Sequence, residues 1–485
     1  MSERSPLRPQ CTSMLAGMML VVLLGACASV GPDFVAPATP TLDRYTPADP
    51  VSLDAGSTET GQRLTRGEPV APAWWNLFAS HELDDVVALA LANSPTLQTA
   101  HADVAQADEL LAAARGGRYP QVELAATAAR GNATTTHTTS NAINSSTVGP
   151  SLSFALDAFG ATARRVEQAE AVVDYQRAQL DGGVLTLTGG TVLQALALAS
   201  ALEQTRAVQD IIAADERNLE LVRFSAAAGK SAGLDVLTAE SQLASDRALL
   251  PPLLQQASAA RHALAVLVGR SATEWAPPDL DFGVLMLPAD LPLVLPSELV
   301  HRRPDIAAAE AQLHVSSASI GVATAQLYPA VTLSASWTAA STGGALFANP
   351  ASVWDIAASV IAPVFNGGTL RAQRAAAMDA YAAQLGVYRQ TVLQAFGQVA
   401  DALQSLEHDA MLVDAQRKAL DAAQATLDLT RQSFEAGQTS FLQIIEAQRL
   451  YEQARLGYVR AKAQRYVDTV QLIVALGGAA PADAQ

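Results

Sequence analysis

The chain is poor in cysteine and in aromatic residues. Its 485 residues include two cysteines, Cys11 and Cys27, and only 5% are aromatic. Cys11 lies within a predicted export signal, so one cysteine would remain once that signal is removed. An internal disulfide and a cysteine-ligated metal cluster are therefore excluded. Abundant Ala, Leu, Gln, Arg and Glu favours long helices over a thick globular core.

Positive charge is scarce as well. The chain has 31 Lys and Arg against 47 Asp and Glu, a net charge of -16 at pH 7. Nucleic-acid binding depends on basic patches that neutralise phosphates. We therefore expect no nucleic-acid partner.

Enzyme motifs are missing. Gly229-Lys230-Ser231 has the ending of a phosphate-binding loop, but Phe224 stands where the motif needs its first glycine. The seven histidines form no i, i+4 pair and have no cysteine neighbours suited to zinc. We expect no enzymatic activity, no cofactor and no metal site.

Long hydrophobic runs are missing after Cys27. No stretch offers the roughly 18 consecutive apolar residues of a transmembrane helix. The chain is thus expected to be peripheral or to cross a membrane as β-strands.

What the N-terminus does contain is an export signal. Arg4 and Arg8 precede the apolar stretch 14–24, which is too short to span a bilayer. The next residues, Leu24-Gly25-Ala26-Cys27, resemble the lipobox of bacterial lipoproteins, and Ala28 implies sorting to the outer membrane. We expect cleavage before Cys27 and acylation of its thiol. The alternative is an ordinary secretory signal cut near Ala26 or Ala28.

The chain also repeats itself. Pro95 matches Pro304, and Tyr119-Pro120 matches Tyr328-Pro329 at the same separation. The stretch that ends at Gly229 matches the stretch that ends at Gly437 at almost that separation. A nearly constant offset over each half indicates two tandem copies of one structural unit.

Each copy shows the same predicted order of elements. A helix opens it, two strands follow, and two long helices close it on either side of a break at Gly229 or Gly437. The opening helices are expected at 83–115 and 304–326, and the strands at 122–128, 151–157, 331–338 and 354–362. Polar loops, 131–146 and 341–350, are expected to join the strands of each pair.

The predicted strands have one apolar and one polar face. Val331, Leu333, Ala335 and Trp337 alternate with Ser and Thr. This pattern fits a soluble half-buried sheet or a membrane barrel, and the lipobox favours the barrel. Because four strands cannot close a barrel, the sheet edges are expected to pair with other copies in a symmetric oligomer.

The last long helices carry a coiled-coil seam. Apolar residues recur every seven positions, with Phe396 and Leu403 between them. The seam residues are Val392, Val399, Leu406, Val413, Leu420, Leu427 and Phe434. In the first copy Leu198, Ile212 and Leu219 are equivalent, with Thr205 as a lapse. The helix 392–434 would be about 64 Å long at about 1.5 Å per residue, which suits a tube wall; a soluble bundle is the alternative.

Several motifs together resemble one family. After Cys27 come Val30-Gly31-Pro32-Asp33-Phe34 and then Trp74-Trp75; the second copy opens with Leu295-Pro296-Ser297-Glu298-Leu299 and Arg302-Arg303-Pro304-Asp305-Ile306. The last hairpin has Phe441-Leu442-Gln443-Ile444-Ile445-Glu446-Ala447-Gln448-Arg449. In this order they resemble the TolC-like outer-membrane efflux factors, in particular the acylated NodT-like branch. Arg302 and Arg303 are expected at a solvated boundary before the helix at Pro304.

This resemblance implies a mainly α fold with a membrane β-barrel. Three chains would share one twelve-stranded barrel and a helical coiled-coil tunnel, held in the outer membrane by barrel and lipid anchor and extending into the periplasm. The implied partners are two further copies in a homotrimer, a periplasmic adaptor (membrane fusion) protein, an inner-membrane resistance-nodulation-division pump and outer-membrane lipid.

The resemblance also implies roles for individual residues. Leu442 would form an apolar gate ring, Glu446 an acidic gate residue, and Arg449 a partner that holds the closed state. Asp235 falls beside the equivalent tip of the first copy. The turns at Gly229 and Gly437 would contact the adaptor. Gln443 departs from members that carry a second carboxylate at its position.

The chain is thus predicted to be the outer-membrane channel of a tripartite efflux system, a passive exit duct for small molecules. The contrasting hypothesis is a structural coiled-coil lipoprotein without a pore. Six segments are expected: a signal peptide, 1–26; a lipidated extended segment, 27–78; a first repeat, 79–270; a Pro-rich connection, 271–296; a second repeat, 297–476; and a flexible tail, 477–485. The sequence does not indicate whether drugs, metals or natural products are exported.

Overall fold

A computed structural model describes residues 29–46, 52–53, 61–133, 141–229, 231–342 and 350–478. The predicted signal peptide, its acceptor Cys27 and residues 479–485 of the predicted tail lie outside the described residues. The chain forms two compact units, described separately below. Unit 1 comprises Met1–Pro37, Asp103–Arg177 and Ala308–Arg389, and unit 2 comprises Ala38–Ala102, Ala178–Ala307 and Gln390–Gln485. Each unit therefore takes part of both repeats.

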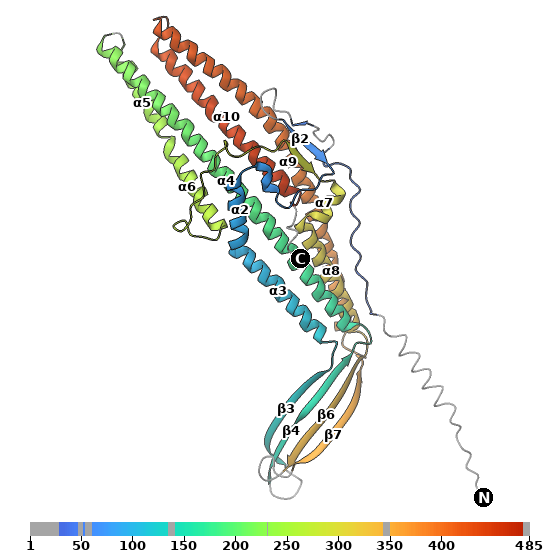
Figure 1. Ribbon diagram of the computed structural model, residues 1–485. Coiled ribbons are helices and arrows are strands. Elements are labelled where there is room, and N and C mark those ends of the chain that lie inside the picture. The colour runs from blue at the N-terminus through green and yellow to red at the C-terminus, as the bar shows by residue number, and fades with distance from the viewer. Residues whose placement is uncertain are drawn as a thin grey trace, which may run out of the picture. The chain divides into compact units, whose positions relative to one another are not determined.

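Unit 1 contains a four-stranded antiparallel sheet, whose strands lie side by side in Figure 1. Its strands are β3 (Gln121–Ala133), β4 (Asn141–Leu156), β6 (Ala330–Thr342) and β7 (Ala351–Ile361), in the order β3-β4-β6-β7. Each repeat supplies one hairpin. The two hairpins join where β4 pairs with β6.

The register of this sheet separates apolar from polar side chains. Val122 pairs with Leu152, Leu152 with Ala335, and Ala335 with Ile356. Successive side chains of a strand alternate between the two faces, so one face collects most of the apolar residues of the four strands. Val353, which pairs with Thr338, and Ile361, which pairs with Ala330, fall on the other face. These include Val122, Leu124, Leu152, Phe154, Leu156, Val331, Leu333, Trp337, Trp354, Ile356 and Val360. The opposite face carries Glu123, Thr127, Thr147, Ser151, Ser153, Thr332, Ser334, Ser336, Thr338, Asp355 and Ser359.

The strands are longer than expected. Strand β3 continues to Ala133 and β4 already begins at Asn141, so most of the stretch 131–146 predicted as a loop is strand. Strands pair through backbone hydrogen bonds, so polar residues can continue a strand as well as apolar residues can. This holds when one face of the sheet is polar. Ser341 and Thr342 extend β6 in the same way.

The helices follow the same order in both repeats. The first repeat has α2 (His81–Asn93), α3 (Pro95–Gly116), α4 (Ala161–Ala227), α5 (Gly233–Arg247) and α6 (Leu250–Leu267). The second has α7 (Pro296–Arg302), α8 (Pro304–Ala325), α9 (Thr369–Glu435) and α10 (Phe441–Ala475). Helices α4 and α9 have 67 residues each, more than the predicted stretch 392–434.

Two predicted helices are interrupted by proline. The single helix expected at 83–115 is α2 and α3, because Ser94, which precedes Pro95, is extended with ψ 120°. The second long helix of the first repeat is α5 and α6, because Pro251 and Pro252 in the first turn of α6 lack the N–H that a continuous helix needs. In the second repeat α10 has no proline and continues over 35 residues.

The predicted seam lies inside unit 2. Val399, Leu403 and Leu406 are fully buried, and Val392, Val413 and Leu427 are at most 5% exposed. In the first repeat Leu198 and Leu219 are buried, and the lapse at Thr205 is buried too. The Thr205 hydroxyl donates to the carbonyl of Ala201 at 2.7 Å, so its polar group is satisfied within the helix.

A small second sheet was not expected. Strands β2 (Gln62–Arg66) and β5 (Asp290–Leu293) pair in parallel, and β1 (Ser52–Leu53) pairs with β2. Strand β2 belongs to the segment 27–78, predicted to be extended, and β5 belongs to the predicted Pro-rich connection 271–296. The sheet therefore joins these two stretches. Next to β2, the helical turn η1 (Trp74–Phe78) buries Trp74 and Phe78 in unit 2.

One described helix passes a composition test for crossing a membrane. An 18-residue window of α4 has a mean hydropathy of 1.5, and 56% of that window is buried. A buried core helix passes the same test, so this window alone does not indicate a membrane span.

Strand β4 approaches β6 unusually closely at Gly149. A Cβ atom at this position would lie 2.0 Å from the carbonyl oxygen of Trp337. We predict that Gly149→Ala destabilises the protein by about 1–3 kcal/mol, because the contact is with backbone that cannot move aside. Thermal unfolding followed by circular dichroism measures this. Ser151→Ala, in the same strand, is the matched control, and equal unfolding temperatures for the two variants would contradict the prediction.

Candidate functional site: sheet edges, hairpin tips and buried carboxylates

The sheet of unit 1 ends in two edge strands, β3 and β7. Residues 121–130 of β3 and every residue of β7 are exposed. Large apolar side chains are among them, with Trp354 71% and Ile356 78% exposed. Among the described residues neither edge pairs with a further strand. Long, apolar, unpaired edges are templates for pairing with another chain.

The strands are long enough to cross a bilayer. They have 13, 16, 13 and 11 residues, and a tilted transmembrane strand needs about 9–11.

The N-terminal segment with the motif Val30 to Phe34 is fastened within unit 1 by Arg164. The Arg164 side chain is 4% exposed and binds Asp33 at 2.8 Å and Glu167 at 2.7 Å. It also donates to the carbonyls of Val30 and Gly31. Phe34 stacks on His314 with ring centroids 4.3 Å apart. The segment that follows the predicted lipid site is therefore anchored in this unit.

The two hairpin tips, where α4 meets α5 and α9 meets α10, have the same turn. Gly229 and Gly437 both have φ +72°, a backbone conformation that favours glycine. Below the turns, residues of the two hairpins form one apolar cluster: Leu219, Val222, Ala239, Leu243, Phe441 and Ile444. Phe434 packs against the cluster and meets Phe441 edge to face at 6.1 Å.

Equivalent polar contacts join the two helices of each hairpin. In the first repeat Arg223 binds Glu240 at 2.5 Å, and at the matching positions of the second repeat Arg431 donates to Gln448 at 2.9 Å. The duplication is thus visible in side-chain contacts as well as in the backbone.

The predicted gate residues of the second repeat lie near the start of α10. The Leu442 side chain is 57% exposed. Arg449 binds Glu446 at 2.8 Å, one helical turn apart, and both side chains are about half exposed. Such an exposed pair contributes only a few tenths of a kcal/mol within one chain.

Asp235 has a local role. Its carboxylate accepts a hydrogen bond from the backbone N–H of Ala232 at 3.0 Å, which caps the first turn of α5. Gln443 occupies the repeat-equivalent position in α10. Asp235 therefore helps to shape the start of α5.

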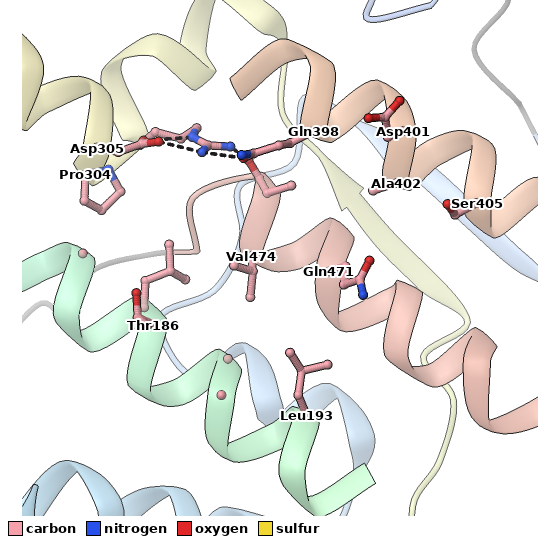
Figure 2. A pocket seen from close by; sticks show the side chains of 16 residues that line it. Thr186, Leu193, Pro304, Asp305, Gln398, Asp401, Ala402, Ser405, Gln471 and Val474 are labelled. Carbon is pink, nitrogen blue, oxygen red and sulfur yellow. Dashed lines mark hydrogen bonds and ion pairs between the residues drawn. The ribbon is translucent and has the colours of Figure 1, made fainter. Parts of the chain in front are cut away.

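The sequence suggested that Arg303 lies at a solvated boundary, but the structure buries it. It is 7% exposed and binds Asp305 at 2.7 Å, Gln398 at 2.8 Å and the carbonyl of Ala475 at 2.7 Å. Asp305 and Gln398 appear in Figure 2 beside a groove of about 620 Å³ that is lined by α4, α9 and α10. The reason for the difference is that α8 begins against the end of α10, where the carbonyl of Ala475 needs a donor. Arg302 is more exposed and lies 3.8 Å from Glu298.

Buried carboxylates form a feature that the sequence analysis did not single out. In unit 2, burial and the neighbouring Asp468 raise the pKa of Asp409 to about 7, although Arg465 acts in the opposite direction. Asp409 is 7% exposed, and Arg465 is held by the side chain of Gln62 at 3.0 Å. Asp409 follows the seam residue Leu406 by three positions, a spacing that places it beside the core.

A second group lies closer to the tips. Burial, with contributions from Asp246 and Glu452, raises the pKa of Asp215 to about 8, and burial raises that of Glu452 to about 7. Asp215 follows the seam residue Ile212 by three positions. In both groups the sequence signal was an acidic residue three positions after an apolar seam residue.

Comparisons with known proteins agree on one family. The family of outer membrane efflux proteins matches residues 86–270 and again residues 295–478. The pyoverdine export outer membrane protein OpmQ of Pseudomonas aeruginosa is 33% identical over 481 residues, 96% of either chain. Nodulation protein T of Rhizobium leguminosarum bv. viciae is 30% identical over 491 residues, 96% of this chain and 93% of that protein.

A solved structure shows the same fold. The outer-membrane channel OprN superimposes with a TM-score of 0.82 at 28% identity, over 93% of this chain and 99% of that chain. The chain is thus an outer-membrane channel subunit that combines barrel strands with long tunnel helices. The predicted fold class, including the tandem repeat, is confirmed.

The chain belongs to the outer membrane efflux protein family. It is an outer-membrane channel component of an efflux system, as predicted from its motifs. The roles of Cys27, Leu442, Glu446, Arg449, Asp235, Gly229 and Gly437 and the boundaries of the six segments stay predictions.

The raised pKa of Asp409 predicts a dependence of stability on pH. The unfolded chain ionises this carboxyl near pH 4, whereas the folded chain keeps it protonated to about pH 7. Its contribution is therefore full below about pH 4 and is lost as the pH rises to about 7. Asp409→Asn should remove this part of the slope and stabilise the protein at pH 8 by about 2 kcal/mol or more relative to the wild type.

Thermal unfolding between pH 4 and pH 8 measures this difference. Asp428→Asn, which changes an exposed carboxylate on the same helix, is the control and should leave the slope unchanged. Parallel curves for Asp409→Asn and the wild type would show that Asp409 is ionised in the folded protein.

Proposed function

We propose that three copies of this chain form one outer-membrane duct, with four strands from each copy in a twelve-stranded barrel. The observation that carries this proposal is the sheet with one continuous apolar face and two unpaired edges. In a bilayer every backbone donor and acceptor needs a partner, so an open four-stranded sheet cannot stand alone. Pairing β7 of one copy with β3 of the next satisfies both edges.

The two faces of the sheet define the lining of the duct. The apolar face, with Trp354 and Ile356, would face lipid, and the face with Ser, Thr and Asp355 would line water. The matching fold of the OprN channel supports this arrangement. Acyl chains on Cys27 would add a second hold on the membrane, next to the segment that Arg164 fastens.

The helices of the three copies would form a tunnel whose far end closes at the hairpin tips. Leu442 would contribute an apolar ring and Glu446 an acidic one. Arg449, which binds Glu446 within one chain, would hold the closed state. Because the exposed pair contributes little, its rearrangement during opening costs little.

A periplasmic adaptor would contact the tips at Gly229 and Gly437 and open them, and a proton-driven resistance-nodulation-division pump would supply the energy. The duct itself would be passive and would catalyse no reaction. Its cargo would then be set by the pump.

Single-channel conductance in planar bilayers tests the duct. The purified protein should show low conductance when closed. Replacing Leu442 and Glu446 together, as Leu442→Ser with Glu446→Ala, should raise conductance several-fold and increase antibiotic entry into cells.

Leu429→Ser with Asp428→Ala, which changes an exposed leucine and an exposed acid on α9, is the matched control and should leave conductance at the wild-type level. A purified trimer that conducts under no condition would favour the pore-free coiled-coil lipoprotein. Conductance that is present but unchanged in the double variant would refute only the gate assignment.

A further inference from the structure

Three carboxylates from three different helices meet inside unit 2. Asp215 lies on α4, Asp246 on α5 and Glu452 on α10, and they are 5%, 6% and 5% exposed. One oxygen from each can be chosen so that all lie within 4.8 Å of one another. The group therefore links the first hairpin to the second, on the side of the tip cluster away from the turns.

Two oxygens of this group have no hydrogen-bond partner among the residues that the structure describes. They are Oδ2 of Asp215 and Oε1 of Glu452, and both are fully buried. The third residue, Asp246, accepts a hydrogen bond from the side chain of Gln242 at 2.8 Å. Buried acceptors without a donor are rare in folded proteins and indicate a missing ligand, proton or water.

The neighbouring arginines pair with other carboxylates. Arg247 binds Glu216 at 2.6 Å, and Arg455 binds Asp210 at 2.5 Å. Within the described part of the chain, the three carboxylates thus lie close together in the interior and form no ion pair with an arginine. Burying such charges costs several kcal/mol for each ion unless a positive charge compensates them.

Helix packing does not require these acids. At the repeat-equivalent positions the second hairpin has Ala423 for Asp215 and Ala454 for Asp246, and the first hairpin has Ala244 for Glu452. The hairpin in which alanine fills both places still forms the same turn and the same arginine contact. The carboxylates therefore have a role other than packing.

The side chains of Asp215 and Asp246 share a hydrogen bond, but the third carboxylate, Glu452, has an oxygen within 4.8 Å of both. Oxygen ligands lie about 2.3–2.6 Å from Ca²⁺ and about 2.1 Å from Mg²⁺, so two ligands on opposite sides of the ion are roughly 4–5 Å apart. A proton joins one pair of oxygens, whereas a divalent cation takes an oxygen from all three residues. Carboxylate oxygens are the ligands that these hard cations prefer.

We infer that Asp215, Asp246 and Glu452 bind a divalent cation of the Ca²⁺ or Mg²⁺ type, which ties α4 and α5 to α10. Short motifs did not reveal this site because its ligands come from three helices that are far apart in the sequence. A cation at this site would stabilise the packing of unit 2 whether the tips are open or closed.

Calorimetric titration with CaCl₂ and with MgCl₂ tests the site on the full-length protein in detergent, after treatment with EDTA. The wild type should bind one of these ions at one site per chain, and its unfolding temperature should rise when the ion is added. Asp215→Asn and Glu452→Gln should each weaken binding at least tenfold and abolish the rise. Both changes replace a buried carboxyl group by an amide of the same shape, so the variants are expected to fold.

Asp210→Asn is the matched control, because Asp210 is an exposed carboxylate on α4 that already binds Arg455. It should bind the ion as the wild type does. Absence of binding to the wild type, or equal binding by Asp215→Asn, Glu452→Gln and the control, would overturn the inference. Variants that are more stable than a wild type unaffected by either ion would instead show that the cluster is held by protons.

Discussion

The fold depends on one requirement: the backbone groups at the edges of a four-stranded apolar sheet must find partners. In water an edge strand is solvated, but in hydrocarbon each unsatisfied N–H or C=O costs several kcal/mol. The register from β3 to β7 carries most of the apolar side chains of the four strands onto one face. Such a face is stable in lipid, so the edges must be paired there too.

The duplication pairs one edge of each hairpin within the chain. Each repeat makes one hairpin, and the pairing of β4 with β6 joins them. Gly149 permits this junction because a side chain there would collide with the backbone at Trp337. The remaining two edges require further copies, and this requirement gives the trimer its physical reason.

The helical part obeys a different requirement, the burial of a seam. Val399, Leu403 and Leu406 pack as a coiled-coil pattern dictates. Carboxylates one turn away, Asp215 and Asp409, are buried with it. They make the packing of unit 2 sensitive to protons and, through the site inferred at Asp215, to cations.

Regular patterns in the sequence predicted the regular parts of the structure. Alternation in 331–338 and the heptads from Val392 identified the sheet and the seam, because both patterns directly reflect which side chains are buried. The limits of the strands were missed, because polar residues continue the ladder beyond the alternating stretch. The break between α5 and α6 was missed although Pro251 and Pro252 mark it.

Local sequence patterns did not predict contacts between residues that are far apart in the chain. Arg303 was expected in solvent, since its partners Gln398 and Ala475 come from other helices. No local sequence pattern indicates the parallel pairing of β2 with β5 or the ion pair between Arg164 and Asp33. The gate residues at the tip came from family resemblance, because an exposed leucine and an exposed i, i+3 ion pair occur on many helix surfaces.

Disulfide cross-linking between copies tests the central claim most directly. Glu123→Cys on β3 is combined in turn with Val353→Cys, Asp355→Cys, Ala357→Cys or Ser359→Cys on β7, and the parent chain serves as the control. If β7 of one copy pairs with β3 of the next, at least one combination should yield covalent trimers in non-reducing gels, which dissociate on reduction. Monomers alone in every combination would contradict the account.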